Sequence, residues 1–287
     1  MSIAYHDGQW VEKSGIRVGV SDFGFARGLA IFELARVYGG RVFRLDDHLT
    51  RLQNGVAAIG GQLPVSLAEL AEIARQLCDR NKFAHSALKF YFTAGEARKS
   101  PLAFAGDHDF APHLIVLEDE VRPGHPEAPY GLDYYRRGQR IKIVAEERAL
   151  AGIKSTGYMQ GFIASREAGV EWDDILFTHR KGHVTEATRS NFFCVVDGVL
   201  CTPDADMLFG ITRKVVLEIA RGLNMPVAER SLMPKDVFRA TEAFTTGSIA
   251  ELVPIRKIDA HVMATTMEGP VFSALRKAFS DVTGVVS

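Results

Sequence analysis

Short apolar runs separated by glycine-containing turns dominate the first 45 residues. The runs IAYHDGQWV, IRVGV and IFELARVY have the length of β-strands, and Gly39-Gly40, between LARVY and RVFRL, is typical of a two-residue hairpin turn. The apolar positions of HLTRLQNGVAAIG recur at helical spacing, so this segment is predicted to be a helix with Asp46 or Asp47 as its N-cap. Ser66 is expected to cap a second helix, LAELAEIARQLCDRN, and the strand-like runs ALKFYFTAG and PHLIVLED follow.

A proline-rich segment interrupts this pattern near the middle of the chain. EVRPGHPEAPYG contains Pro123, Pro126 and Pro129, so neither a helix nor a central strand is expected to cross it. We therefore predict two domains, residues 1–119 and residues 131–287, joined by a linker over residues 120–130.

The second half of the chain continues as a mixture of strands and helices. The strand RIKIVAEE precedes a helix expected to start at Ser155, and DDILFTHR, the turn Lys181-Gly182 and a strand from His183 to NFFCVVDG form a predicted hairpin. A helix TRKVVLEIARGLN, with Thr212 as its cap, precedes the strands EAFTTGS and AELVPI and a C-terminal helix. Because strands and helices do not alternate regularly, we expect an α/β chain of the α+β type and no doubly wound sheet.

Composition narrows the class of protein. The 287 residues are 47% hydrophobic and 24% charged, with a formal net charge of −1, so no overall field favours nucleic acid or an anionic membrane as a partner. The cysteines (Cys78, Cys194 and Cys201) form no CxxC pair and are expected to be reduced thiols. We find no signal-peptide pattern and no apolar run near the ~20 residues that span a bilayer, and we expect a cytoplasmic protein.

The segment AGIKSTG places a lysine in unusual surroundings. Lys154 has the small or apolar neighbours Ala151, Gly152, Ile153 and Gly157, whereas most lysines are solvated surface charges. Apolar surroundings lower the pKa of a lysine amine and so favour its use as a nucleophile. The alternative is an ordinary surface charge.

Several motifs together resemble one enzyme family. The IKST segment and TEATRSNFF (Thr185 to Phe193) resemble the lysine and Glu-x-x-x-x-Asn motifs of the class IV aminotransferases, which have fold type IV of the pyridoxal-phosphate (PLP) enzymes. FGFARGLAIFELARVY, DDHLTRL, FGITR and TTGSIAELVPI are also similar, so the resemblance extends over almost the whole chain. It implies a smaller two-layer N-terminal domain, a larger C-terminal domain with a barrel-like sheet, PLP between the domains, and a homodimer.

The resemblance implies a role for each matching residue. Lys154 is expected to form the Schiff base with PLP and to carry the substrate proton, and Glu186 to pair with the ring nitrogen. Without the motifs, Glu186 would be read as a solvated hairpin carboxylate and Arg51 as a helix-surface residue. The other expected cofactor contacts bind the phosphate or lie beside the ring: Arg51, Asn191, Ile211, Thr212, Gly247 and Ser248.

The residues that hold the substrate are less clearly marked. The resemblance places the glycine-rich stretch with Arg27 at the mouth of the active site. Our hypothesis is that Arg27, with help from Lys89 or Arg98, binds the substrate α-carboxylate, and Ile249 is expected to contact the substrate. Lys89 could instead be an outward residue of an edge strand. FTAGEARKSPL lacks the arginine-then-histidine carboxylate trap that is usual for D-amino acids, and Met159 stands where the branched-chain enzymes carry a tyrosine.

The early FELARVY tract is most similar to D-amino-acid aminotransferases. We therefore expect transfer of an amino group between a D-amino acid and a 2-keto acid in two half-reactions. A branched-chain L-amino-acid aminotransferase, aminodeoxychorismate lyase and a catalytically silent PLP-binding protein are the alternatives. No metal site is expected, because His179 and His183 stand on either side of a turn and do not share a helix face.

Overall fold

The computed structural model describes residues 2–97, 110–121 and 132–284. The chain divides into two compact units, Met1–Arg122 with Ile153–Gly157, and Pro123–Gly152 with Tyr158–Ser287. Ile153–Gly157 belongs to the first unit although it lies between two parts of the second unit along the chain. Most of the expected linker, like Arg98, lies outside the described residues.

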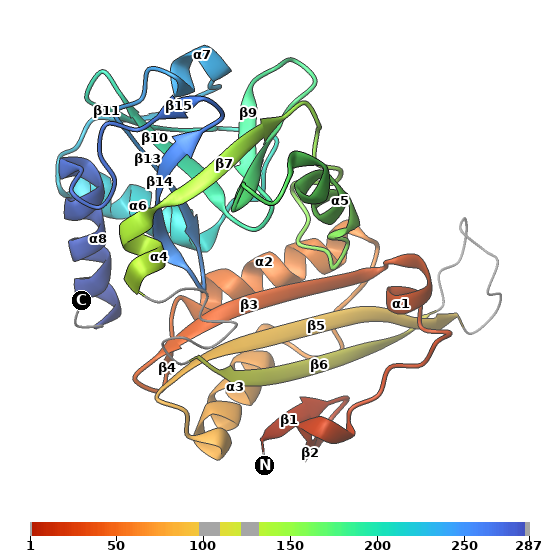
Figure 1. The fold of residues 1–287 in the computed structure, drawn as a ribbon. Helices are drawn as coiled ribbons and strands as arrows, with labels where there is room; N and C mark the ends of the chain where they lie inside the picture. The colour runs from red at the N-terminus through yellow and green to blue at the C-terminus, as the bar shows by residue number, and fades with distance from the viewer. Residues whose placement is uncertain (1, 98–109, 122–131, 285–287) are drawn as a thin grey trace. The chain divides into compact units, whose positions relative to one another are not determined.

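The first unit is built on an antiparallel sheet (Figure 1). Its strands are β1 (Ile3–His6), β2 (Gln9–Glu12), β3 (Ala30–Tyr38), β4 (Arg41–Val42), β5 (His85–Ala97) and β6 (Phe110–Glu120), in the order β2-β1-β6-β5-β3-β4. The hairpin predicted at Gly39-Gly40 is confirmed, since Tyr38 pairs with Arg41 and both glycines have positive φ. The short helices η1 (Lys13–Gly15) and α1 (Phe23–Arg27) lie between β2 and β3 in the chain.

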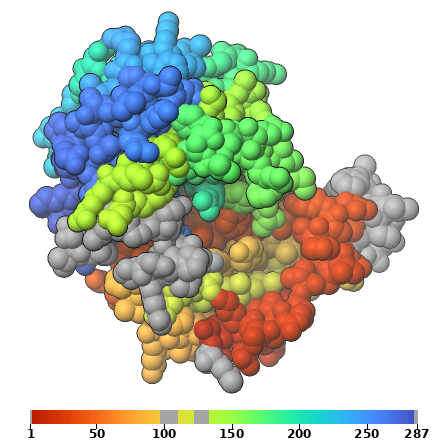
Figure 2. All heavy atoms as spheres, in the orientation of Figure 1, coloured from red at the N-terminus to blue at the C-terminus, as the bar shows by residue number. Residues whose placement is uncertain are grey.

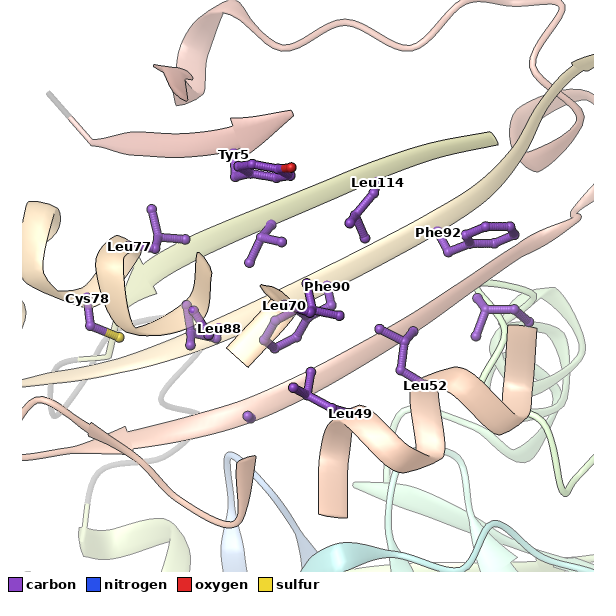
Figure 3. Close-up of a cluster of buried hydrophobic side chains, with 14 of the residues drawn as sticks. Tyr5, Leu49, Leu52, Leu70, Leu77, Cys78, Leu88, Phe90, Phe92 and Leu114 are labelled. Carbon is purple, nitrogen blue, oxygen red and sulfur yellow. The ribbon is translucent and has the colours of Figure 1, made fainter. Parts of the chain in front are cut away.

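Two helices, α2 (Leu45–Ala58) and α3 (Leu67–Asn81), pack on this sheet. Figure 3 shows side chains of both helices meeting those of the strands in one apolar cluster, with Leu49 and Leu52 from α2 and Phe90 from β5 among them. These three side chains are at most 2% exposed, which makes them part of the main apolar stabilisation of the unit.

The helix caps of the first unit confirm one prediction and correct another. Ser66 caps α3 in a capping box with Glu69, as expected. The prediction of Asp46 or Asp47 as the cap of α2 is wrong, because Arg44 occupies that position with φ 53°. The two aspartates lie in the first helical turn, where their charge complements the helix dipole.

The second unit contains a nine-stranded sheet that closes on itself. The ring consists of β7 (Gln139–Val144), β8 (Asp174–Thr178), β9 (Val184–Ala187), β10 (Asn191–Val196), β13 (Glu242–Gly247) and β14 (Glu251–Ile258), with β9 pairing with both β8 and β10. β11 (Val199–Thr202) and β12 (Val227–Glu229) extend the sheet from β10, and β15 (His261–Val262) pairs with β14. The expected barrel-like sheet and the hairpin from DDILFTHR into β9 are confirmed.

Helices accompany this sheet: α4 (Leu132–Arg137), α5 (Met159–Ala168), α6 (Ile211–Gly222), α7 (Pro234–Val237) and α8 (Pro270–Thr283). Phe244 of β13 stacks on Phe193 at 5.1 Å and meets Phe272 of α8 at 5.5 Å. Figure 2 shows α4 (yellow-green) beside α8 (blue), where the Arg276 guanidinium lies 4.8 Å from the Tyr135 ring centroid.

Three expectations about element positions are wrong. α5 begins at Met159 and not at Ser155, because Ser155 forms a β-bridge with Ile31. The cap of α6 is Gly210, and Thr212 lies in the first turn of the helix with its side chain buried. The edge-strand reading of Lys89 fails because β5 lies between β3 and β6. Among the described residues, no helix has both the length and the apolar character required to cross a membrane.

Candidate active site

Lys154 lies on a segment that extends the first sheet beside the start of β3. The Phe32 amide donates to the Lys154 carbonyl at 2.9 Å, and the Thr156 amide donates to the Ala30 carbonyl at 3.2 Å. The Lys154 ammonium lies 4.5 Å from the centroid of the Phe32 ring. Backbone bonds at the lysine carbonyl and two residues later therefore hold the segment against β3 and set the direction in which the half-buried Lys154 side chain leaves the strand edge.

A buried charge cluster lies on β3 and α2 of the same unit. The Glu33 carboxylate is fully buried and accepts from Arg51 Nε and Nη2, both at 2.7 Å. His48 Nδ1 lies 3.2 Å from Glu33 Oε1, and the His48 side chain is only 2% exposed. Burial alone would raise the pKa of Glu33, but the charge of Arg51 and the bond with His48 hold this pKa well below its usual range.

His48 has the opposite constraint. Burial lowers the pKa of His48, the Glu33 carboxylate opposes this shift, and the positive charges of Arg51 and Lys154 lower the pKa further. The imidazole is therefore neutral near pH 7. It lies beside the Glu33 carboxylate and within the electrostatic range of the positive charges of Arg51 and Lys154. It follows that the Lys154 ammonium, Arg51 and His48 share one electrostatic environment.

Glu186 is the centre of a second cluster, which lies in the second unit. Its side chain is 3% exposed, and Oε1 accepts from Arg148 Nη1 at 2.5 Å and from the Leu208 amide at 3.1 Å. Oε2 accepts from Asn191 Nδ2 at 3.3 Å. The alternative of a solvated hairpin carboxylate is therefore excluded by the burial of the group.

Asn191 connects Glu186 to the start of α6. Its Nδ2 also donates to the Leu208 carbonyl at 2.7 Å, and a Cβ built on Gly210 would lie only 2.0 Å from its Oδ1. Gly210 is the N-cap of α6, and no side chain caps the helix. The first amides of a helix have no intrahelical acceptor, so this uncapped end, beside a close approach that only glycine allows, fits an anion such as a phosphate.

The turn between β13 and β14 contains the other residues expected near the phosphate. Gly247 ends β13, and Ser248 and Ile249 occupy the following turn, all of them half-buried. Thr246, immediately before them, is 2% exposed, and its Oγ1 has no hydrogen-bond partner in the described part of the chain. An unsatisfied buried hydroxyl next to this turn is consistent with a polar ligand there.

The structure separates the candidate substrate residues. Arg27 ends α1, is exposed, and donates through Nη1 to the Ala26 carbonyl at 3.0 Å. Lys89 forms an ion pair with Asp119 at 3.0 Å, and Lys13 contacts the same carboxylate. Tyr158 is the half-buried N-cap of α5, whereas Met159 is 75% exposed.

Three residues of the two clusters were missed in the sequence: Glu33, His48 and Arg148. Glu33 interrupts an apolar strand, which was a visible signal of a special role. His48 precedes Arg51 by three helical positions, so both can face one carboxylate. Arg148 carries no local signal, because its partner Glu186 is distant in sequence.

Comparison with known proteins agrees with these features. The family model "Amino-transferase class IV" matches residues 30–258. A putative branched-chain-amino-acid aminotransferase of Methanocaldococcus jannaschii is 28% identical, over 97% of this chain and 95% of the relative. A D-alanine aminotransferase of Staphylococcus aureus (strain N315) is also 28% identical, over 97% of each protein.

Solved structures show the same fold. The branched-chain aminotransferase of the archaeon Thermoproteus uzoniensis, solved with norvaline, is 26% identical and superposes with a TM-score of 0.84, covering 99% of this chain and 95% of that one. Another branched-chain aminotransferase, solved with pyridoxamine 5'-phosphate, is 25% identical and superposes with a TM-score of 0.88 over the same shares of the two chains. The agreement confirms the fold class expected from the motifs.

His48 should make the first unit sensitive to mild acid. Because its pKa in the folded protein is below the ordinary value of 6.5, the unfolded chain binds the proton more tightly, and stability falls as the pH drops below that value. In His48→Gln this component should vanish, so the free energy of unfolding should fall less steeply between about pH 6.5 and 5, by up to about 1.4 kcal/mol per pH unit.

The measurement is urea unfolding across this pH range, with His85→Gln, at an exposed position of the same unit, as the matched control. The control should keep the wild-type slope. An unchanged slope in His48→Gln would contradict the assignment of a buried neutral imidazole.

Proposed function

The chain belongs to the class IV aminotransferases, which are PLP-dependent enzymes, and we propose that its amino donor is a D-amino acid and its acceptor a 2-keto acid. The observation that carries the assignment of the cofactor residues is the connection from Glu186 through Asn191 to Gly210. One end of this connection is a buried carboxylate suited to a pyridinium nitrogen, and the other is an uncapped helix start suited to a phosphate.

In this proposal two groups of residues in the second unit contact the cofactor, one at the ring nitrogen and the other at the phosphate. Glu186 would accept a hydrogen bond from the ring nitrogen, and the hydrogen bond from Arg148 holds the carboxylate in place. Ile211 and Thr212 offer the first amides of α6 to the phosphate, and Gly247 and Ser248 offer the β13–β14 turn. When bound, PLP supplies an electron sink that stabilises negative charge on the substrate Cα.

Lys154 would hold the cofactor covalently and move the proton of the substrate Cα. Its ammonium lies 4.5 Å from the centroid of the Phe32 ring, and its side chain is half-buried, so part of the solvent around the amine is excluded. We assign Arg51 to the phosphate as well. Glu33 fixes the orientation of its guanidinium by accepting two hydrogen bonds from it. Asn191 acts as a positioning residue between Glu186 and α6.

The proposed preference for D-amino acids is supported by the sequence of Ala30–Tyr38 and by the D-alanine aminotransferase relative. The branched-chain relative, at the same identity, makes a branched-chain L-amino acid the second candidate donor. For the substrate α-carboxylate we propose Arg27 ahead of Lys89, because Lys89 already forms an ion pair with Asp119. Ile249 would lie beside the substrate in the β13–β14 turn. A homodimer is proposed as the working assembly.

The donor can be identified from single half-reactions. Protein loaded with PLP should be mixed with D-alanine, L-alanine or L-leucine, and the change in cofactor absorption and the keto acid released should be measured. D-alanine should react faster than both L-amino acids. Reaction with L-leucine alone would establish the branched-chain candidate, and pyruvate release from aminodeoxychorismate without an acceptor would establish the lyase.

Lys154→Ala serves as the catalytic control in this experiment. It should show no turnover and no borohydride-stable link between cofactor and protein, because no other amine is assigned to that role. Lys277→Ala, at an exposed position on α8, should behave as wild type. A trapped link on a different lysine would overturn the assignment of Lys154.

Gly210 should be required for cofactor binding. In Gly210→Ala the new methyl group would collide with Asn191, and the displaced amide would leave both Glu186 and Leu208. Loss of a hydrogen bond to a charged group weakens binding by about 10-fold or more, measurable by equilibrium dialysis of PLP. Gly222→Ala, at the open end of the same helix, should bind PLP normally. Equal affinity in the two variants would contradict the proposed connection.

Arg27→Ala should raise KM for the amino donor by about 10-fold or more, since a charged hydrogen bond to the carboxylate is lost. Lys89→Ala is the comparison, because its ammonium is held by Asp119, and it should change KM little. Steady-state kinetics with a saturating keto acid measure both effects. A normal KM in Arg27→Ala would transfer the role away from this residue.

A further inference from the structure

Four side chains of the second unit form what we call the histidine cluster: His179, His183, Asp206 and Glu147. His179 follows β8 and His183 precedes β9, so the two stand on the two sides of the hairpin turn, as the sequence indicated. The turn does not keep them apart. Their rings stack at 4.6 Å with an interplanar angle of 17°, and both imidazoles are almost fully buried.

The donor atoms of His179, His183 and Asp206 lie within 4.8 Å of one another, and Glu147 adds a contact to His179. His183 Nε2 lies 3.1 Å and His179 Nε2 lies 3.8 Å from Asp206 Oδ2, and Glu147 Oε1 lies 3.5 Å from His179 Nε2. In a tetrahedral site with metal–ligand distances of about 2.0–2.1 Å, neighbouring ligand atoms lie about 3.3 Å apart. The separations from Asp206 Oδ2 to the two Nε2 atoms lie on either side of this value, and the three ligand atoms all lie within 4.8 Å of one another.

The two carboxylates of the cluster are partly exposed, 40% for Asp206 and 46% for Glu147, and have no basic partner other than the histidines among the described residues. Asp206 and Glu147 form ion pairs only with the two histidines, and no lysine or arginine side chain lies within 4.0 Å of either carboxylate in the described part of the chain. A divalent cation would balance both charges and use the lone pairs of both rings.

One existing contact opposes binding. The Lys181 amide donates to His179 Nδ1 at 3.1 Å, which places the proton of the neutral ring on Nε2. A cation at Nε2 moves this proton to Nδ1 and breaks the bond to the amide. The site therefore has to rearrange the Lys181-Gly182 turn, which limits its affinity without removing any ligand.

The cluster is connected to the cofactor contacts of the second unit through the chain itself. Asp206 lies on the loop between β11 and α6, and two residues later Leu208 donates to Glu186 and accepts from Asn191. Asp206 also adopts the left-handed backbone conformation, with φ 60°. A cation at the cluster would tie this strained loop to the β8–β9 hairpin.

We propose that His179, His183 and Asp206 bind a divalent transition-metal ion of the zinc class, with Glu147 in contact with His179 beside them. The ion ties the loop that precedes α6 to the β8–β9 hairpin and so stabilises this loop.

The test uses the PLP-loaded enzyme. Zinc affinity is measured by competition with a chromophoric chelator, and cobalt(II) is added as a spectroscopic probe of tetrahedral coordination. We expect one equivalent of zinc, a tetrahedral cobalt spectrum and a higher Tm with zinc. Asp206→Asn, which retains a side chain tolerant of the left-handed backbone, should lower zinc affinity by more than the about 10–100-fold typical of changes outside the ligand set.

A second histidine cluster provides the matched control. His6 Nε2 and His113 Nδ1 both face Asp7 Oδ2, at 3.3 and 2.5 Å, but the two imidazoles are 25% and 36% exposed, against 9% for His179 and 12% for His183. His6→Gln should leave zinc affinity and the zinc-dependent Tm unchanged, whereas His183→Gln should abolish both. Zinc binding that survives Asp206→Asn and His183→Gln, or that His6→Gln removes, would overturn the proposal, as would the absence of zinc binding by the wild type.

Discussion

The pairing of Glu186 with Asn191 is the contact on which the second unit depends. It is the register pair that brings β9 against β10 and so closes the sheet, and the same two side chains are joined by a hydrogen bond. Closing the ring removes two exposed strand edges. Because both residues are buried, their polar groups need partners. Arg148 and the Leu208 amide donate to Glu186, and Asn191 Oδ1 lies against Gly210, where a side chain would not fit. The same pair of residues therefore closes the sheet and positions the polar groups of the candidate site.

The first unit contains a fully buried negative charge, the Glu33 carboxylate, inside its apolar layer. Glu33 points from β3 towards α2, where Arg51 and His48 satisfy it. A buried ion pair often adds little net stability, yet removing one partner typically costs about 3–5 kcal/mol. Such an arrangement is costly in a core, and here it places the charge of Arg51 and the His48 ring in the same electrostatic environment as Lys154.

Much of the fold could be predicted from local patterns. The glycine hairpin at Gly39-Gly40 and the capping box at Ser66 follow from backbone conformation and from hydrogen bonds within four residues. The predicted caps of α2 and α6 were wrong, because the N-caps are Arg44 and Gly210, neither of which caps through its side chain, and the predicted residues lie inside the first turn. At α8 the first amides are met by Glu242, whose carboxylate accepts from the Phe272 amide at 2.7 Å across 30 positions of the chain. No local pattern contains that contact.

By itself, the sequence determined the enzyme family, the cofactor and most of the succession of strands and helices along the chain, because turns, caps and apolar periodicity act over short distances. The tertiary structure decided which charges meet. Glu33 with Arg51, Glu186 with Arg148, and His179 and His183 with Asp206 are pairings between elements distant in the chain. Electrostatic energy depends on distance in space and on burial, and neither quantity is defined until the strands have found their register.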